Sequence, residues 1–218
     1  MSQGLRYKFN GSTFQVQTGF VGTSPENDIS AITQANPAVV TITGHTLTDG
    51  DVIKITEVAG MTHLNNNLYV VDDAVAGSTV ELAGEDTSEA DAYTSGGIVN
   101  EVDFSNFCEL TGANQQDGAA DQIEVTTICS TAKEFEQGLS DSGTLQLDYN
   151  AAPNSTVQTA LRTAKVAGTQ LAFKITFPNS GGTIIMIGTV QQQSVSGQVN
   201  GVWAGSATIK LTGPIFVM

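Results

Sequence analysis

The chain has little of what marks a secreted, membrane-spanning or disulfide-stabilised protein. No apolar run reaches the about 18 residues of a membrane-spanning helix, and the first residues, MSQGLRYKFNGS, lack the apolar segment of a secretory signal. We therefore expect a protein that is made in a cytoplasm and stays there until it is assembled or released. The only cysteines, Cys108 and Cys129, lie on separate predicted strands. Because a cytosolic protein keeps its thiols reduced, we expect two small buried residues and no disulfide.

Basic residues are also scarce, with eight lysines and arginines against 22 acids and a net charge of −14. Tight phosphate binding uses lysine and arginine patches, which this chain lacks. The charge is uneven: residues 28–100 carry eleven acids and one base, and residues 101–148 carry ten acids and one base. From residue 149 onward there are four bases and no acid. Opposed charge blocks favour self-complementary contacts, within the fold or between copies, although a merely solvated surface explains them equally well.

Residues that could carry out chemistry are sparse. The two histidines, His45 and His63, lie 18 residues apart without a nearby cysteine, so we expect surface or turn histidines and no metal site. No G-x-S-x-G motif is present, and the glycine-rich stretches lack the lysine of a phosphate-binding loop. The sequence therefore predicts no enzyme and no catalytic, cofactor-binding or metal-binding residue.

What the chain does contain is the alternation of apolar and polar residues that is typical of β-strands. One strand is predicted to begin at Ile123 and run to Cys129, followed by a turn through Gly138 and Gly143 and a second strand over 145–149. One convincing helix follows, with Asn154 or Ser155 as its N-cap and with Gly168 at its end. The sequence predicts a mainly β fold with one flanking helix.

Other segments refine this prediction. Residues 37–99 contain short strands separated by turn signals, which suggests a small barrel or sandwich. Residues 112–121 have no apolar periodicity, so we expect a mobile loop. Residues 183–190 are almost continuously apolar, as in a strand covered on both faces. The apolar tail, residues 214–218, either folds onto its own sheet or docks on another copy.

Four stretches resemble parts of two known families. The run V-T-T-x-x-S-T-A-K-E-F-E-x-G-L-x-D-S-G, with FKITFPNSGGTIIMIGTV and WAGSATIKLTG, resembles tail tube proteins (major tail proteins) of long non-contractile-tailed bacteriophages. The stretch TGHTLTDGDVIKITEVAGMTHLNNNLYVV resembles a small β-barrel module named after the first catalytic-cysteine half-domain of ubiquitin-activating enzymes. That stretch has no cysteine, so no thioester chemistry is expected. The resemblance implies a discontinuous tail tube domain, residues 1–27 and 101–218, with residues 28–100 as an inserted small β-barrel domain.

The resemblance also implies a function. Six copies of a β-sandwich with a flanking helix would form a ring with a continuous β-barrel lumen, and the rings would stack into a tube. Such a tube encloses the tape measure protein, ends at tail terminator and tail tip proteins, and conducts DNA without binding it specifically. An acidic or neutral lumen would suit this role, because it repels phosphates. The protein would be assembled in the cytoplasm of a bacterial host, located in the virion tail, and have no membrane partner.

The resemblance assigns contact roles to two sets of residues. Subunit contacts are expected at Thr126, Thr127, Lys133, Glu134, Gly138 and Leu139. An inter-ring loop is expected at Asn114, Gln115, Gln116 and Asp117. The insertion would project outward and could touch the host surface.

Two other functions fit the same sequence. The chain could be a binding module that recognises a host surface glycan or protein as a monomer or small oligomer, using loops such as residues 65–67. It could also form the tube of a contractile injection machine. Tubes or hexamers in an electron micrograph would favour the structural role, and a stable glycan-binding monomer would favour the first alternative.

Overall fold

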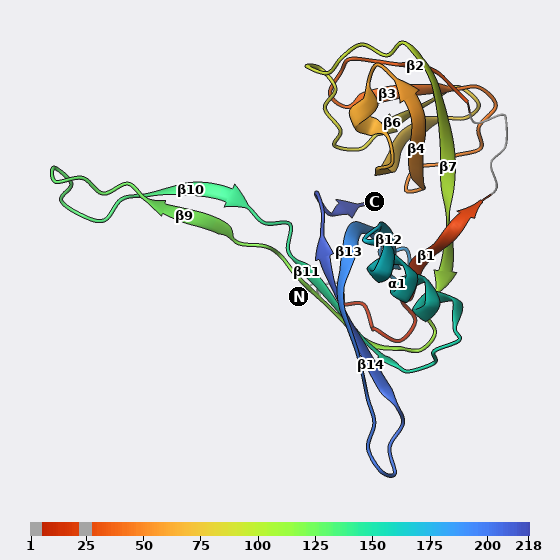
Figure 1. Ribbon diagram of the computed structural model, residues 1–218, viewed down its shortest axis with the longest axis vertical. Helices are drawn as coiled ribbons and strands as arrows, with labels where there is room; N and C mark the ends of the chain where they lie inside the picture. Colours follow the sequence, from red (N-terminus) through yellow and green to blue (C-terminus); the bar gives the residue numbers. More distant parts are fainter. Residues whose placement is uncertain (1–5, 22–27) are drawn as a thin grey trace, which may run out of the picture.

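The computed structural model describes residues 6–21 and 28–218, and its fold is mainly β (Figure 1). We call residues 28–100 the insert and the described residues 6–21 and 101–218 the main domain. One path of hydrogen-bonded strands runs through both, in the order β2-β3-β6-β5-β4-β7-β1-β12-β13-β14-β11-β8. The expected mainly β fold with one flanking helix is confirmed over the described residues.

The insert is a closed barrel. Its strands are β2 (Ile29–Ile32), β3 (Ala38–Ile42), β4 (Val52–Ala59), β5 (Leu68–Val75), β6 (Thr79–Leu82) and the first half of β7 (Ser95–Asn106), with a 3-10 turn η2 (Thr62–Leu64) after β4. A bridge between Asp28 and Ile98 returns the start of β2 to β7 and closes the ring of strands. Buried aliphatic side chains fill the interior, as the short apolar strands predicted. One prediction here is wrong: His45 is buried and not at the surface.

The main domain is one strongly bent sheet closed by a helix. It comprises β1 (Thr13–Val21), the second half of β7, β8 (Leu110–Gln116), β11 (Thr144–Asn150), α1 (Thr156–Ala167), β12 (Gln170–Thr176), β13 (Thr183–Ser196), β14 (Ala204–Leu211) and β15 (Phe216–Val217). β13 pairs with β12 through its first half and with β14 through its second, with a bulge between Val190 and Gln192. The core lies between the sheet and α1, and includes Leu147, Leu161 and Phe173.

The α-helix begins and ends where local chemistry dictates. The hydroxyl of Ser155 accepts a hydrogen bond from the backbone N–H of Gln158, so Ser155 is the N-cap. Gly168 is in the left-handed conformation at φ 66°, and its N–H bonds the carbonyl of Ala164. Leu161 is fully buried on the face toward the sheet. Both predicted ends of this helix are confirmed.

β13 serves two cores. Met186 and Val190 face the core beneath α1, whereas Ile185 and Ile187 face a second cluster shared with the insert. This second cluster includes Val70 from β5 and Val102 from β7. The prediction that residues 183–190 are covered on both faces is therefore confirmed, and the insert is joined to the main domain by a continuous apolar contact.

The apolar tail folds back onto its own sheet. β15 pairs with the start of β13, with Phe216 opposite Ile185 and Val217 opposite Ile184. The ring of Phe216 also packs at the edge of the cluster shared with the insert. Of the two alternatives for residues 214–218, the structure shows the first.

Three sequence-based expectations about residues 108–143 are wrong. Residues 112–121 are not a mobile loop, because they form most of β8 and the start of β9 (Ala120–Glu124). The strand predicted over 123–129 ends at Glu124, and its partner is β10 (Phe135–Ser140), so Gly138 lies in a strand and not in a turn. The alternation that begins at Ile123 continues to Cys129, past the end of β9 at Glu124, so it does not locate the turn. Cys108 and Cys129 are exposed, since they lie in connections outside the core.

Candidate assembly interface

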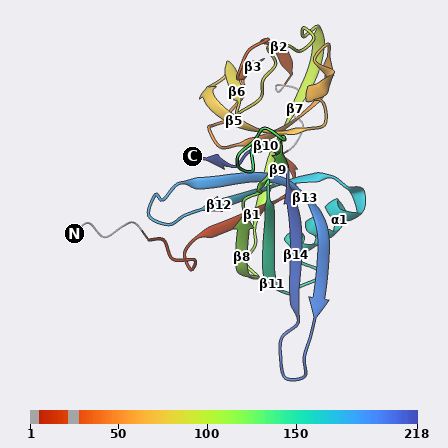
Figure 2. The ribbon, with the colours of Figure 1, turned by 90° about the vertical axis from the view of Figure 1, so that its left-hand side faces the viewer.

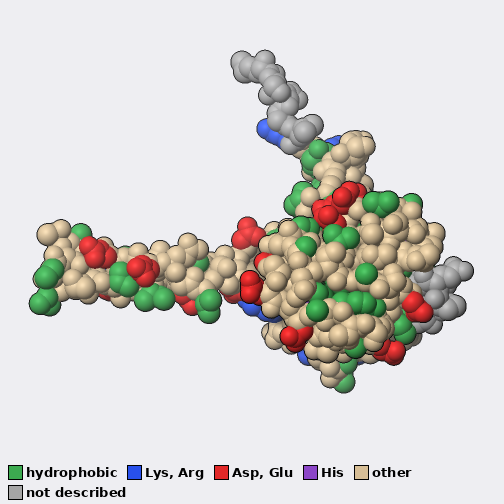
Figure 3. Space-filling view, turned by 90° about the horizontal axis from the view of Figure 1, so that it is seen from above, with side chains coloured by type: hydrophobic (Ala, Val, Ile, Leu, Met, Phe, Trp, Pro, Cys, Tyr) green, Lys and Arg blue, Asp and Glu red, His purple; other side chains and the backbone are tan. Residues whose placement is uncertain are grey.

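A two-stranded arm projects from the main domain (Figures 1 and 3). We define the arm as residues 117–142. Its strands β9 and β10 form a sheet of their own, separate from the main sheet. Each side of the arm holds about 12 residues, which extend at about 3.3 Å each, so the arm reaches up to about 40 Å.

The arm exposes large apolar side chains along its whole length. Ile128 at the tip is fully exposed at 104%, Leu139 is 88% exposed, and Ile123 and Phe135 are each more than half exposed. Figure 3 shows green apolar atoms gathered along the arm between acidic residues. A lone hairpin is at best marginally stable in water, and exposed apolar surface of this kind marks an interaction site. The arm therefore has the properties of a segment that is buried against a partner.

Polar contacts shape the tip of the arm. The Oγ1 of Thr126 donates to Glu124 and accepts from the backbone N–H of Glu134, at 3.0 and 3.1 Å. Lys133 pairs with Glu124 at 3.2 Å. Thr127 Oγ1 accepts a hydrogen bond from the backbone N–H of Cys129. Since these pairs are exposed they contribute little energy, but they hold the tip in one shape.

All six residues expected at subunit contacts lie on the arm: Thr126, Thr127, Lys133, Glu134, Gly138 and Leu139. The structure brings them together on one projecting element, and their contact role stays a prediction. The sequence-based interpretation missed Ile128 and Phe135, although their apolar character in a polar stretch was a usable signal.

The base of the arm is held by an ion pair and two glycines. Lys210 on β14 binds the carboxylate of Asp141, and hydrogen bonds from Lys210 and from the backbone N–H of Gly143 lower the pKa of Asp141. A Cβ on Gly143 would lie 2.1 Å from the carbonyl oxygen of Gln116, and one on Gly118 would lie 2.1 Å from that of Asp141. Any larger side chain would push the two chains of the arm apart where they leave the body.

Three of the four residues expected in an inter-ring loop lie in a strand instead. Asn114, Gln115 and Gln116 are in β8, opposite Gln146, Leu145 and Thr144 of β11. Asp117 follows directly, at the start of the arm. β8 is the last strand of the path, so its other edge offers unpaired backbone groups. The loop assignment is wrong for Asn114, Gln115 and Gln116, and a contact role for the four residues is still a prediction.

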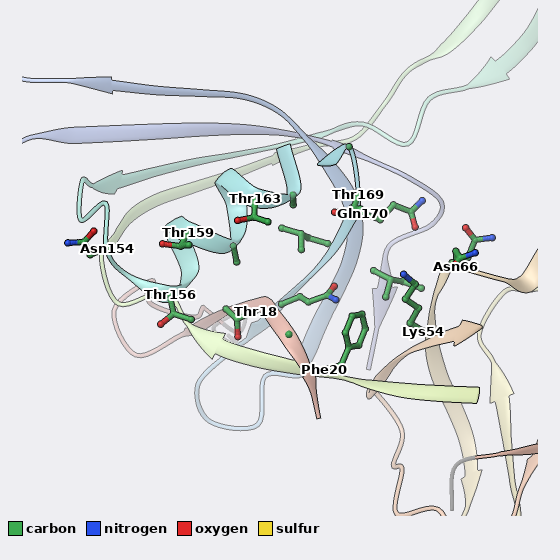
Figure 4. A pocket seen from close by; sticks show the side chains of 18 residues that line it. Thr18, Phe20, Lys54, Asn66, Asn154, Thr156, Thr159, Thr163, Thr169 and Gln170 are labelled. Carbon is green, nitrogen blue, oxygen red and sulfur yellow. The ribbon is translucent and has the colours of Figure 1, made fainter. Parts of the chain in front are cut away.

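A groove of about 1000 Å³ lies on the other side of the main domain (Figure 4). We call it the α1 groove. Figure 4 shows Thr159 and Thr163 of α1 along one side, Lys54 and Asn66 of the insert opposite, and Phe20 of β1 between them. Its lining also includes Gln17, Leu68 and Leu171, and no acidic residue is among the lining residues that the structure describes. Lys54 lies over the ring of Phe20, with Nζ 5.9 Å from the ring centroid.

Within residues 6–21 and 28–218, no group of three His, Cys, Asp or Glu side chains is placed to hold a metal ion. In the same part of the chain no helix is long and apolar enough to cross a bilayer.

Two known families are similar to parts of the chain. Residues 87–184 match the family described as "Phage tail tube, TTP, lambda-like". This segment is similar in sequence to phage tail tube proteins. Residues 35–103 match the family described as "Ubiquitin-activating enzyme E1 FCCH domain", a likeness of fold only, since the segment has no cysteine. Both family resemblances inferred from the sequence are confirmed, and the first supports a structural role in a tail tube.

The tail tube match begins inside the insert and ends in β13. It therefore includes β7, the arm, β11, α1 and β12. The fold is also similar to a chain from the tail of an empty GTA particle refined helically with C6 symmetry, with a TM-score of 0.44 and 14% identity over 53% of this chain and 86% of that one. No curated protein sequence matches the chain.

Proposed function

We propose that this chain is the repeating subunit of a phage tail tube, in which six copies form a ring and the rings stack. The observation that carries the proposal is the tail tube match over a segment whose arm, residues 117–142, exposes Ile128 and Leu139 almost completely. Apolar surface of this kind, beside an open β8 edge, is what a self-assembling β protein presents before assembly.

In this proposal the tube encloses the tape measure protein, meets tail terminator and tail tip proteins at its ends, and lets DNA pass. The net charge of −14 supports passage without specific binding, since like charges repel the phosphate backbone. The proposed discontinuous domain, residues 1–27 and 101–218, builds the tube wall, and the insert projects outward. Assembly takes place in the bacterial host cytoplasm, and the product is located in the virion.

Sedimentation and negative-stain microscopy over a range of concentrations test this proposal. We expect six-subunit rings or tubes with a hollow bore above a critical concentration. A matched chain without the tip of the arm, with residues 126–134 replaced by a two-residue Asn-Gly turn, should keep its fold and stay monomeric. A wild-type chain that stays monomeric at millimolar concentration would contradict the proposal. It would favour the alternative that the chain is a binding module.

A further inference from the structure

We infer that the α1 groove receives the arm tip of a second copy, with Ile128 as the apolar anchor. This inference rests on the proposed function, because it names the surface on which one subunit holds the next. It goes beyond that function because the tube role alone does not say what binds in the groove, and the inference names the arm tip of a second copy.

The arm tip needs a partner that offers apolar surface. Ile128 is fully exposed, and the strands behind it add Phe135 and Leu139. The α1 groove offers Phe20, Leu68 and Leu171 among neutral polar side chains. Its volume of about 1000 Å³ is at the upper end of the range for small-ligand sites. It can therefore take the tip of a hairpin and not a whole arm.

The charges of the two surfaces are complementary. The arm carries six acids and one base, Lys133, for a net charge of −5. Among the described residues of the lining, Lys54 is the one cation and none is an acid. The helix α1 beside it carries Arg162 and Lys165. Opposite potentials on two surfaces favour the encounter and fix its register, and suppress contact between like surfaces.

The arm of one chain does not reach its own groove. In Figure 1 the arm leaves the main domain on the left, whereas α1 and β1, which frame the groove, lie to the right of β13. In Figure 2 the view is from the arm side, and α1 lies behind β13 on the far right. An arm on one side and a groove on the other produce a head-to-tail contact, which closes into a ring or continues as a helix.

Disulfide trapping tests the inference, because Cys129 already stands beside Ile128 at the tip. A chain with Cys108→Ser and Thr163→Cys has one thiol on the arm and one in the groove, both at exposed positions. Mild oxidation of assembled protein should produce a ladder of covalent oligomers on a non-reducing gel. The control is Cys108→Ser with Gln198→Cys, whose new thiol lies in the exposed β13–β14 loop, and it should remain mostly monomeric.

A second variant tests the electrostatic part. Lys54→Glu in the trapping chain reverses the one charge among the described residues of the lining, and should reduce the yield of linked oligomers at least fivefold at low salt. Lys165→Glu, on the same side of the molecule but outside the lining, should reduce the yield of linked oligomers less than Lys54→Glu does.

The outcomes separate this inference from the proposed function. Tubes without a Thr163→Cys link, or with a link only to Gln198→Cys, would overturn the inference and leave the tube role standing. The groove would then await another occupant, such as a neutral glycan. If neither tubes nor rings form, the proposed function fails and the inference fails with it.

Discussion

The Nζ of Lys174, in the middle of β12, donates a hydrogen bond to the carbonyl oxygen of Gly50 over 3.0 Å. Gly50 is in the turn before β4, so this bond joins the main domain to the insert. The same ammonium lies over the ring of Phe104, 5.5 Å from its centroid. Together with the cluster around Ile185, this contact fixes the insert against β12 and β13.

Replacing Lys174 by Met should destabilise the protein, because the Gly50 carbonyl loses a charged donor and Phe104 loses its cation. We expect a loss of about 1.5–3 kcal/mol, which lowers the unfolding temperature by about 3–12 °C. Thermal unfolding followed by circular dichroism measures this. Lys165→Met on the exposed side of α1 is the control and should unfold at the wild-type temperature. An unchanged midpoint for Lys174→Met would show that the contact contributes nothing.

Glu101 makes stability depend on pH. Burial raises the pKa of Glu101 above its ordinary value, and the neighbouring Asp51 and Asp103 raise it further. A group whose pKa is raised by folding contributes stability below its unfolded pKa, and that contribution is lost as the pH rises through the folded value. Glu101→Gln should therefore raise the unfolding temperature at pH 7 and lose this advantage below about pH 4.

The measurement is a series of thermal melts between pH 4 and pH 8. Glu89→Gln, at an exposed position of the insert, provides the control and should follow the wild-type curve. Lys174 lies close to Glu101 and opposes the shift, so the gain at pH 7 should be smaller than burial alone would produce. A destabilised Glu101→Gln at pH 7 would mean that the attraction to Lys174 is the stronger effect.

The caps of α1 should each contribute measurably. Ser155→Ala removes the acceptor for the backbone N–H of Gln158 and should cost about 1 kcal/mol. Gly168→Ala places a side chain at φ 66° and should cost about 1–2 kcal/mol. Chemical denaturation gives both values. Thr163→Ala, at an exposed position within the helix, should not destabilise, and a loss there equal to that of Ser155→Ala would refute the capping interpretation.

The exposed residues of the arm should affect assembly and not folding. Ile128→Ser and Leu139→Ser alter side chains that contact mostly water, so monomer stability should change by less than about 0.5 kcal/mol. Burial of one such side chain in an interface contributes about 1.5–3 kcal/mol, so the critical concentration should rise tenfold or more. Sedimentation velocity measures the fractions of monomer and of assembled protein. Val75→Ser, exposed on the insert, should assemble as wild type, and normal assembly of Leu139→Ser would exclude it from the interface.

The sequence was most informative where one short segment contains all the interacting groups. The ends of α1 depend on Ser155 and Gly168, each of which acts on backbone groups within a few residues. The strand over 183–190 was recognisable because side chains on both faces meet apolar partners. The turn of the arm was not recognisable in the same way, since water covers both faces of the arm and the alternation from Ile123 to Cys129 runs past the end of β9.

By itself, the sequence determined the mainly β class, the one helix with both of its caps, the resemblance of the arm to tail tube proteins and the uneven charge. These follow from local spacing and composition. Only the tertiary structure decided that residues 112–116 pair with β11, that β13 serves two cores, and that the arm and the α1 groove lie on opposite sides. Those relations depend on which distant segments pack together, and packing is decided by the fit of whole surfaces that no local pattern records.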